Sequence, residues 1–141
     1  MKLLILALMA VGLGCSAIAQ SASTDITAHS FHWQVTHQGE WKYELYLPKR
    51  YKLQITNRWP LMLFLHGIGE RGTNVSKVFA HGPIKLAHDG HLFPFIIVAP
   101  QCPDGKFWNN TEALIELLDY VEKSCRVDTM RVYLAGLLTP A

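Results

Sequence analysis

The residues with the clearest chemical meaning are those that lead up to a nucleophile. The segment Arg131–Leu137 predicts a buried strand that runs into a turn at Gly136. A sharp strand-to-helix turn of the form G-x-S-x-G exposes a serine above a sheet, from where its hydroxyl attacks a carbonyl carbon. In this chain the next residue is Leu138, followed by Thr139-Pro140. The pattern therefore predicts the approach to a nucleophile, with leucine at the nucleophile's position.

A second candidate site follows the continuous apolar run Leu61–Leu65. The residues after this run are His66-Gly67-Ile68-Gly69-Glu70-Arg71-Gly72. A glycine-rich turn directly after a buried strand lets backbone N–H groups point into a cleft at the strand's carboxyl end, where sheets of this class place their ligand sites. We therefore expect a binding cleft at this turn.

The strands that position these residues follow from the hydrophobic pattern. Two apolar runs, 61–65 and 95–99, are bounded by Pro and Gly and predict strands buried on both faces, as in a parallel sheet. Residues 31–35 and 41–47 alternate apolar and polar side chains about a turn at Gln38-Gly39. That alternation predicts a hairpin with one buried face.

Two helical regions are expected between these strands. Residues 74–87 predict one or two short helical turns, broken at Gly82-Pro83. A longer helix is expected from Thr111 to Ser124, because apolar residues recur there at helical spacing. Asn109 followed by Glu112 resembles a capping box, which predicts Asn109 as the capping residue.

The chain resembles the secreted esterases of the α/β-hydrolase fold. The nearest groups are the feruloyl and acetyl-xylan esterase-like proteins and the carboxylesterase and phospholipase group, some members of which carry the label "predicted peptidase". The segments that carry the resemblance are Tyr43–Pro48, Trp59–Gly72, Phe93–Pro103 and Val127–Leu137. It implies a three-layer α/β sandwich with a mostly parallel sheet, truncated after about the fifth strand.

The resemblance also implies roles within the glycine-rich turn. In this family the turn supplies one N–H of the oxyanion hole, and the residue after the nucleophile supplies the other. The matching position is the backbone N–H of Ile68. The alternative is that Gly67 and Gly69 only permit a tight turn.

The charged residues of the turn have weaker claims to chemistry. The catalytic histidine of this fold comes after the nucleophile in the chain, so we expect His66 to brace the turn by hydrogen bonding. Glu70 and Arg71 are candidates for substrate binding, but we favour a role in holding the turn in shape. The sequence leaves open whether Trp108 lines the cleft or caps the following helix.

The implied activity is hydrolysis of a carboxylic ester by a serine nucleophile. The family pattern continues with Ser-Met-Gly-Gly where this chain has Leu138-Thr139-Pro140. We therefore expect an inactive N-terminal fragment of such an enzyme, with no catalytic residue in this chain. The alternative is a non-catalytic exported binding or interaction module derived from the same fold. The resemblance implies a small-molecule or polysaccharide-linked ester as the intact relative's substrate, and the oligomeric state stays open.

The cysteines are expected to be free thiols. Cys102 follows a predicted strand, and Cys125 ends the helix that returns from it, ~20 Å away along the helix. A disulfide needs Cα atoms within ~7 Å, so the layout argues against a bridge. A nucleophilic role for Cys102 is disfavoured, because the sequence places no basic partner beside it to lower the pKa of its thiol.

The N-terminus has the pattern of an export signal. Lys2 precedes an apolar stretch, and Ala17-Ile18-Ala19 forms a cleavage site before Gln20. The apolar stretch is shorter than the ~20 residues that span a membrane. Lipid attachment at Cys15 is the alternative, weakened by glycine at position 12 where such signals prefer leucine.

These features divide the chain into three parts. We expect a signal peptide at 1–19, a disordered leader at 20–30, and the N-terminal half of an α/β-hydrolase domain at 31–141. The predicted location is secreted or periplasmic.

Composition excludes several other classes of function. The formal net charge is +2, far from the strongly basic field that nucleic-acid binding needs. The seven histidines are scattered and form no H-E-x-x-H motif, and no C-x-x-C pair occurs. We expect no metal, no cofactor and no nucleic-acid partner.

Overall fold

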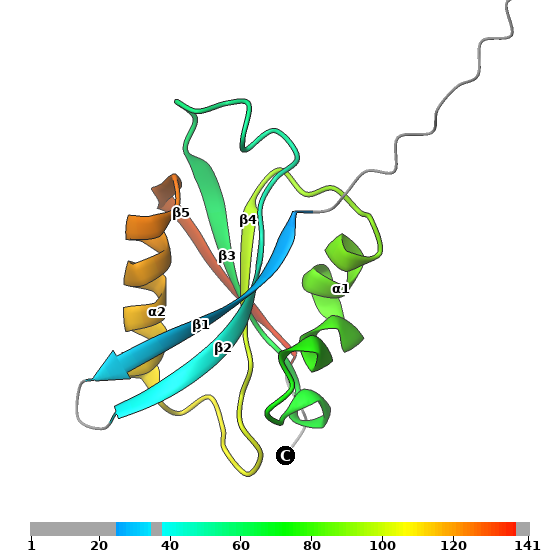
Figure 1. Cartoon of the computed structure of the whole chain (residues 1–141), viewed down its shortest axis with the longest axis vertical. Helices are drawn as coiled ribbons and strands as arrows, with labels where there is room; N and C mark the ends of the chain where they lie inside the picture. The colour runs from blue at the N-terminus through cyan, green and yellow to red at the C-terminus, as the bar shows by residue number, and fades with distance from the viewer. Residues whose placement is uncertain (1–24, 35–37, 138–141) are drawn as a thin grey trace, which may run out of the picture.

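A computed structural model describes residues 25–34 and 38–137 (Figure 1). Five strands form one sheet in the order β1-β2-β4-β3-β5. The bounds are β1 Ile26–Gln34, β2 Gln38–Tyr46, β3 Trp59–Leu65, β4 Ile96–Pro100 and β5 Val127–Gly136. β1, β2 and β4 pair antiparallel, whereas β4, β3 and β5 pair parallel. The parallel half is the half expected from the two apolar runs.

Helices cover both faces of the sheet. They are α2 Thr111–Ser124 on one face and α1 Gly82–His88 with the 3-10 turn η2 Val75–Ala80 on the other, as Figure 1 shows. A further 3-10 turn, η1 Ile68–Glu70, follows β3. The core beneath α2 gathers aromatic and aliphatic side chains from every strand. A smaller core beneath α1 is built around Tyr46, Phe64 and Ile97.

The residues of β4 explain why a helical layer covers each face of the sheet. All five of its residues are buried, including Ile96, Ile97 and Val98. A strand with apolar side chains on both faces requires a layer on each face, and the helices of the two crossovers provide these layers. β3 is less completely buried, because its far neighbour β5 is the last strand of the sheet among the described residues.

Four expectations from the sequence are wrong. The first is the burial of Arg131–Leu137: most of these residues are exposed in β5, because no described strand pairs with its outer edge. The other three concern where elements begin and what caps them. Ile26–Ser30 belong to β1 and pair with β2, so the predicted disordered leader at 20–30 does not extend over them. Gln38 and Gly39 also lie in β2, paired with Gln34 and Trp33, and are not the hairpin turn. The local pattern did not predict these two extensions of the strands. The residues there are mostly polar or small and have little strand preference, and they are held in the sheet by backbone pairing.

The last error concerns the cap of α2. The helix spans Thr111–Ser124 as predicted, but the capping side chain is Asn110, whose Oδ1 accepts from the N–H of Ala113 at 3.1 Å. Asn109 and Asn110 are adjacent, and the sequence pattern could not select between them. The signal-peptide residues 1–19 and residues 138–141 lie outside the described part of the chain.

Candidate active site

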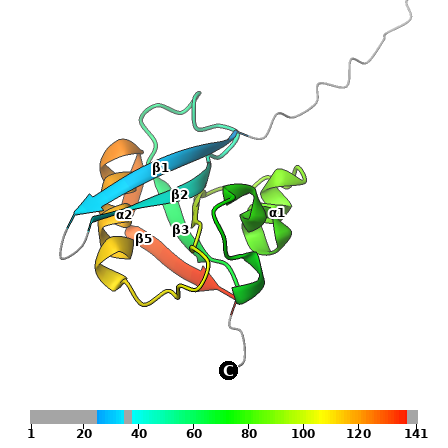
Figure 2. The same ribbon diagram turned by 60° about the horizontal axis from the view of Figure 1, so that its bottom comes forward.

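The candidate site lies at the edge of the sheet where β3, β4 and β5 end. Parallel strands bring their carboxyl ends to the same edge, so His66 after β3 and Gln101 after β4 lie close together. The end of β5 reaches the same place: Gly136 pairs with Leu65, and the N–H of Leu137 donates to the Leu65 carbonyl at 3.1 Å. Figure 2 shows this edge, with the last strand ending beside the segment that follows β3.

His66 braces the glycine-rich turn through both ring nitrogens. Its side chain is 2% exposed. The backbone N–H of Cys102 donates to Nε2 at 3.0 Å, so Nε2 is an acceptor and carries no proton. Nδ1 therefore holds the proton and donates it to the Gly67 carbonyl at 2.8 Å. Both nitrogens are occupied by structural bonds, which leaves none to act as a general base.

The protonation state follows from the same surroundings. Burial lowers the pKa of His66 below its ordinary value of 6.5, against the opposing effects of the Gly67 hydrogen bond and the Glu70 charge. The imidazole is therefore neutral at neutral pH, as the acceptor role of Nε2 requires.

Trp108 holds the start of the turn from the other side. Its indole N–H donates to the His66 carbonyl at 2.9 Å, and its ring meets the His66 ring edge-on at a centroid distance of 5.0 Å. Trp108 also packs edge-on against Trp41 of β2. The indole therefore contacts the turn directly, a question that the sequence left open because 42 positions separate the two partners.

Gln101 was not identified from the sequence. Its side chain is 3% exposed, and Nε2 donates to the carbonyls of Glu70 at 2.7 Å and Cys102 at 3.2 Å. The N–H of Gly72 donates to the Cys102 carbonyl at 2.9 Å. The end of the turn is thereby fastened to the residues after β4. A buried glutamine after a strand is a weak signal, and only the partner carbonyls reveal its role.

Glu70 and Arg71 make separate contacts and do not pair with each other. Glu70 is buried, with Oε1 at 3.4 Å from His81 Nε2 and Oε2 at 4.0 Å from His66 Nδ1. The Arg71 guanidinium lies over the Phe107 ring at 4.0 Å. These contacts hold the turn. Arg71 also lines a small cavity beside the turn.

A small cavity lies against the turn. Its volume is about 80 Å³. Its walls are His66, Gly67, Ile68, Arg71, Phe107, Trp108 and Leu137. Ile68 is half exposed here, whereas His66 and Gly67 are buried. A group bound in this cavity would therefore contact both the turn and the end of β5.

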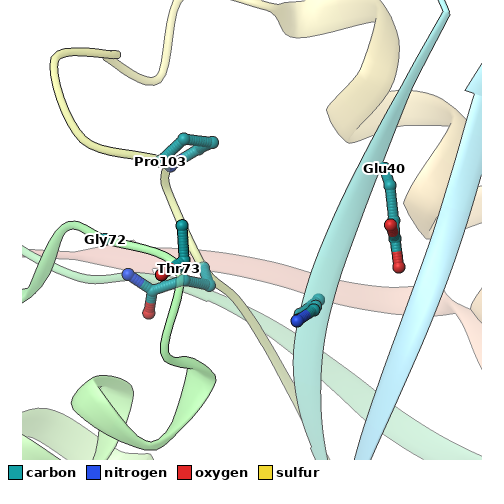
Figure 3. A pocket seen from close by; sticks show the side chains of 6 residues that line it. Glu40, Gly72, Thr73 and Pro103 are labelled. Atoms are coloured by element: carbon teal, nitrogen blue, oxygen red, sulfur yellow. The ribbon is translucent and has the colours of Figure 1, made fainter.

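A larger and more polar cavity flanks the end of the same turn. Its volume is about 260 Å³, and its walls are Glu40, Lys42, Gly72, Thr73, Gln101 and Pro103. In Figure 3, Glu40 on β2 lies on one side of the view, and Gly72, Thr73 and Pro103 lie on the other. The small cavity is lined by the first residues of the turn and by Arg71, whereas the larger one is lined by Gly72 and Thr73 at its end.

Neither Cys102 nor Cys125 has the environment of a nucleophile. Burial raises the pKa of the Cys102 thiol and of the Cys125 thiol above the ordinary value of 9.0. A thiol that stays protonated is a poor nucleophile. Both cysteines are free within the described residues, which confirms the expectation of no bridge between them.

The described residues contain neither a cluster of metal-ligating side chains nor a membrane-spanning helix. No three His, Cys, Asp or Glu side chains among them gather closely enough to hold a metal ion. None of their helices has the length and apolar character needed to cross a membrane.

Solved structures share this fold. A thermostable esterase matches with a TM-score of 0.59 and 24% identity, over 78% of this chain and 34% of the esterase. A ferulic acid esterase from the anaerobic fungus Anaeromyces mucronatus matches with a TM-score of 0.52 and 19% identity, over 79% of this chain and 49% of the other. An isopeptidase matches with a TM-score of 0.52 and 20% identity, over 80% of this chain and 20% of the other. No family model and no curated protein matches the chain.

These similarities confirm the predicted fold class. The described residues make up the first five strands of an esterase-like α/β-hydrolase fold, with helices on both faces of a mixed sheet. The chain spans between a fifth and a half of the length of the solved structures named above. At this level of identity the likeness establishes the fold alone.

Proposed function

We propose that this chain forms the N-terminal part of an exported serine carboxylic-ester hydrolase and supplies one donor of its oxyanion hole, the backbone N–H of Ile68. The observation that carries the proposal is the clamped turn after β3. His66, Trp108 and Gln101 fix its two ends, while Ile68 between them faces a cavity that the end of β5 also lines. Preorganised backbone donors of this kind stabilise a developing oxyanion without reorganisation during the reaction.

The proposed reaction assigns the remaining roles outside the described residues. A serine that follows β5 attacks the ester carbonyl carbon, and a histidine backed by an acid takes the serine proton and passes it to the leaving alcohol. Water then cleaves the acyl-enzyme and releases the carboxylic acid. The Ile68 N–H holds the oxyanion together with the N–H of the residue after the serine.

The chain as printed is inactive under this proposal. Position 138, two residues after the end of β5 in the sequence, is leucine, and a serine would in any case need a neighbouring base to become an effective nucleophile. The histidine of the turn, His66, uses both ring nitrogens in structural hydrogen bonds.

The test is to read the coding sequence downstream of this segment in all three frames and to express the longest continuation. A Ser-Met-Gly-Gly continuation is expected, together with labelling of that serine by a fluorophosphonate probe and hydrolysis of an aryl ester. Changing the serine to alanine serves as the matched control and should abolish both signals. A continuation without a serine elbow would contradict the proposed function.

A second candidate is a non-catalytic exported binding module. The leucine at position 138 and the two cavities beside the turn favour it, since the cavities form from the described residues alone. A natural stop directly after this segment, with ligand binding and no serine-probe labelling, would support this candidate over the first.

Export is part of the proposal in either case. The signal pattern supports cleavage after Ala19, so the mature chain is expected to begin at Gln20. Mass spectrometry of the exported protein measures this directly. A mature chain that begins with a lipid-modified Cys15 would instead show an anchored lipoprotein.

A further inference from the structure

A third cavity lies at the opposite end of the sheet from the His66–Gly72 turn. It sits where β2 ends and where β3 and β4 begin, and its volume is about 280 Å³. Its walls are Pro48, Lys49, Arg50, Trp59, Leu92, Phe93 and Pro94. The connections that hold these residues lie at the top of Figure 1, whereas β5 ends at the bottom.

Two walls of this cavity are fixed by hydrogen bonds to the core. The N–H of Phe93 donates to the Tyr46 hydroxyl at 2.8 Å, and that hydroxyl donates to the Phe93 carbonyl at 3.1 Å. The Tyr46 side chain is fully buried. On the other side, the N–H of Trp59 donates to the Arg126 carbonyl at 2.8 Å. The cavity is therefore preformed and does not depend on a ligand to order it.

The walls combine apolar surface with positive charge. Five of the seven lining residues are proline, aromatic or leucine, and the other two are Lys49 and Arg50. No acidic residue lines the cavity, and no carboxylate among the described residues pairs with either cation. Trp59 adds a buried indole N–H that has no acceptor within the described part of the chain. The polar side chains of these walls, Lys49, Arg50 and Trp59, are thus all hydrogen-bond donors.

We infer that this cavity binds a small apolar carboxylate, such as an arylalkanoate. The hydrocarbon part packs against Trp59, Leu92 and Phe93, which removes apolar surface from water. The carboxylate faces Lys49 and Arg50 and accepts charge-assisted hydrogen bonds from them. The volume lies just below the ~300–1,000 Å³ typical of small-molecule sites, which restricts the ligand to about one ring with a short chain. The inference does not depend on the proposed function, because the cavity is remote from the turn.

The experiment is a saturation-transfer NMR titration of the 141-residue chain with 3-phenylpropionate. The method detects weak ligands on proteins of any association state. The expected result is saturable transfer to the ring protons, with 3-phenylpropanol and acetate binding markedly more weakly. The alcohol lacks the charge, and acetate lacks the apolar group.

Variants then locate the site. Replacing both cations, Lys49→Gln with Arg50→Gln, should raise the Kd about fivefold, because each exposed charge contributes modestly. The matched control, Lys106→Gln with Lys123→Gln, removes the same charge elsewhere and should leave the Kd unchanged. Leu92→Glu places an acid at the wall and should abolish binding while leaving the far-ultraviolet circular dichroism spectrum unchanged.

Three outcomes would overturn the inference. Absence of saturable transfer would show that the cavity does not take this ligand class. Equal Kd values for the acid and the alcohol would show that the cations do not recognise a carboxylate. Equal weakening by the two double variants would show a general effect of charge instead of a site.

Discussion

The backbone N–H of Leu137 donates to the carbonyl of Leu65 at 3.1 Å. This bond continues the parallel pairing of β5 with β3 by one residue beyond Gly136. It sets the last described residue against the start of the turn that contains Ile68, and both residues line the same cavity. The end of β5 and the proposed oxyanion donor are therefore brought together by main-chain pairing alone.

We expect no ester hydrolysis above background from the 141-residue chain or from its Leu138→Ser variant. The described residues that line the cavity at the end of β5 offer a serine at this position no free base to accept its proton, and a single oxyanion donor does not compensate. Even a complete oxyanion hole without its triad leaves only ~10³–10⁴-fold acceleration over water. The measurement is the turnover of an activated aryl ester by each purified protein. Saturable turnover that is lost on changing His66 or Cys102 would show that a catalytic site lies within these residues.

We expect the chain to be marginally stable and to self-associate through β5. No described strand pairs with its outer edge, and Met130 and Leu134 on it are 91% and 70% exposed. Unpaired edges with apolar side chains are templates for association. Leu134→Lys with Met130→Lys should lower the average mass in light scattering across a range of protein concentrations. The control is Leu53→Lys with Ile55→Lys, which changes two equally exposed residues of the loop before β3 and should not. A monomeric wild-type chain with a cooperative unfolding transition would contradict the prediction.

Gly82→Ala should destabilise the chain more than Gly90→Ala. Both glycines have positive φ, +75° and +99°, so each alanine carries the cost of a left-handed backbone. At Gly82 a Cβ would also come within 2.2 Å of the buried Phe64 ring, whereas at Gly90 it would meet nothing within 4 Å. We expect the free energy of unfolding to fall by about 1–3 kcal/mol more for Gly82→Ala, the cost of overpacking a core. Urea unfolding monitored by tryptophan fluorescence measures the difference, and equal losses would refute it.

Glu44→Gln should stabilise the chain at neutral pH and not in acid. Glu44 is 4% exposed, and burial raises the pKa of its carboxyl above the ordinary value of 4.5, with the His88 charge opposing the shift. A raised folded-state pKa contributes stability that is present below pH 4.5 and is lost as pH rises through the folded value. Glutamine stays neutral throughout, so its advantage in unfolding free energy should appear above pH 4.5 and then level off. Glu40→Gln is the matched control on the same strand, because Glu40 is exposed. A pH-independent difference for Glu44→Gln would contradict this account.

Much of the fold was predictable because its signals are local. The apolar runs of β3 and β4, the helical spacing of Thr111–Ser124 and the glycines after Leu65 each lie within one short segment. Burial on both faces of a strand requires apolar residues at every position, which a sequence displays directly. The position of the candidate site followed from the order of these elements, since a turn after a parallel strand lies at the ligand-binding edge.

Other features depended on partners that are far apart in the chain. β1 begins at Ile26 because it pairs with β2. The first residues of β1 are mostly polar or small, and their pattern alone does not predict a strand. Asn110 caps α2 in place of its neighbour Asn109 because the backbone there directs its oxygen to the N–H of Ala113. Local pattern does not encode such pairing geometry.

The sequence by itself determined that leucine stands at position 138, shortly after the last predicted strand, and that a glycine-rich turn follows β3. Only the tertiary structure decided what holds that turn. The sequence favoured a bracing role for His66, but only the fold supplies its partners, the Cys102 N–H on Nε2 and the Gly67 carbonyl on Nδ1. Trp108 and Gln101 acquire their roles from carbonyl groups 42 and 31 positions away. Side-chain chemistry is set by residue type, but whether a nitrogen is free to react is set by the groups that folding brings against it.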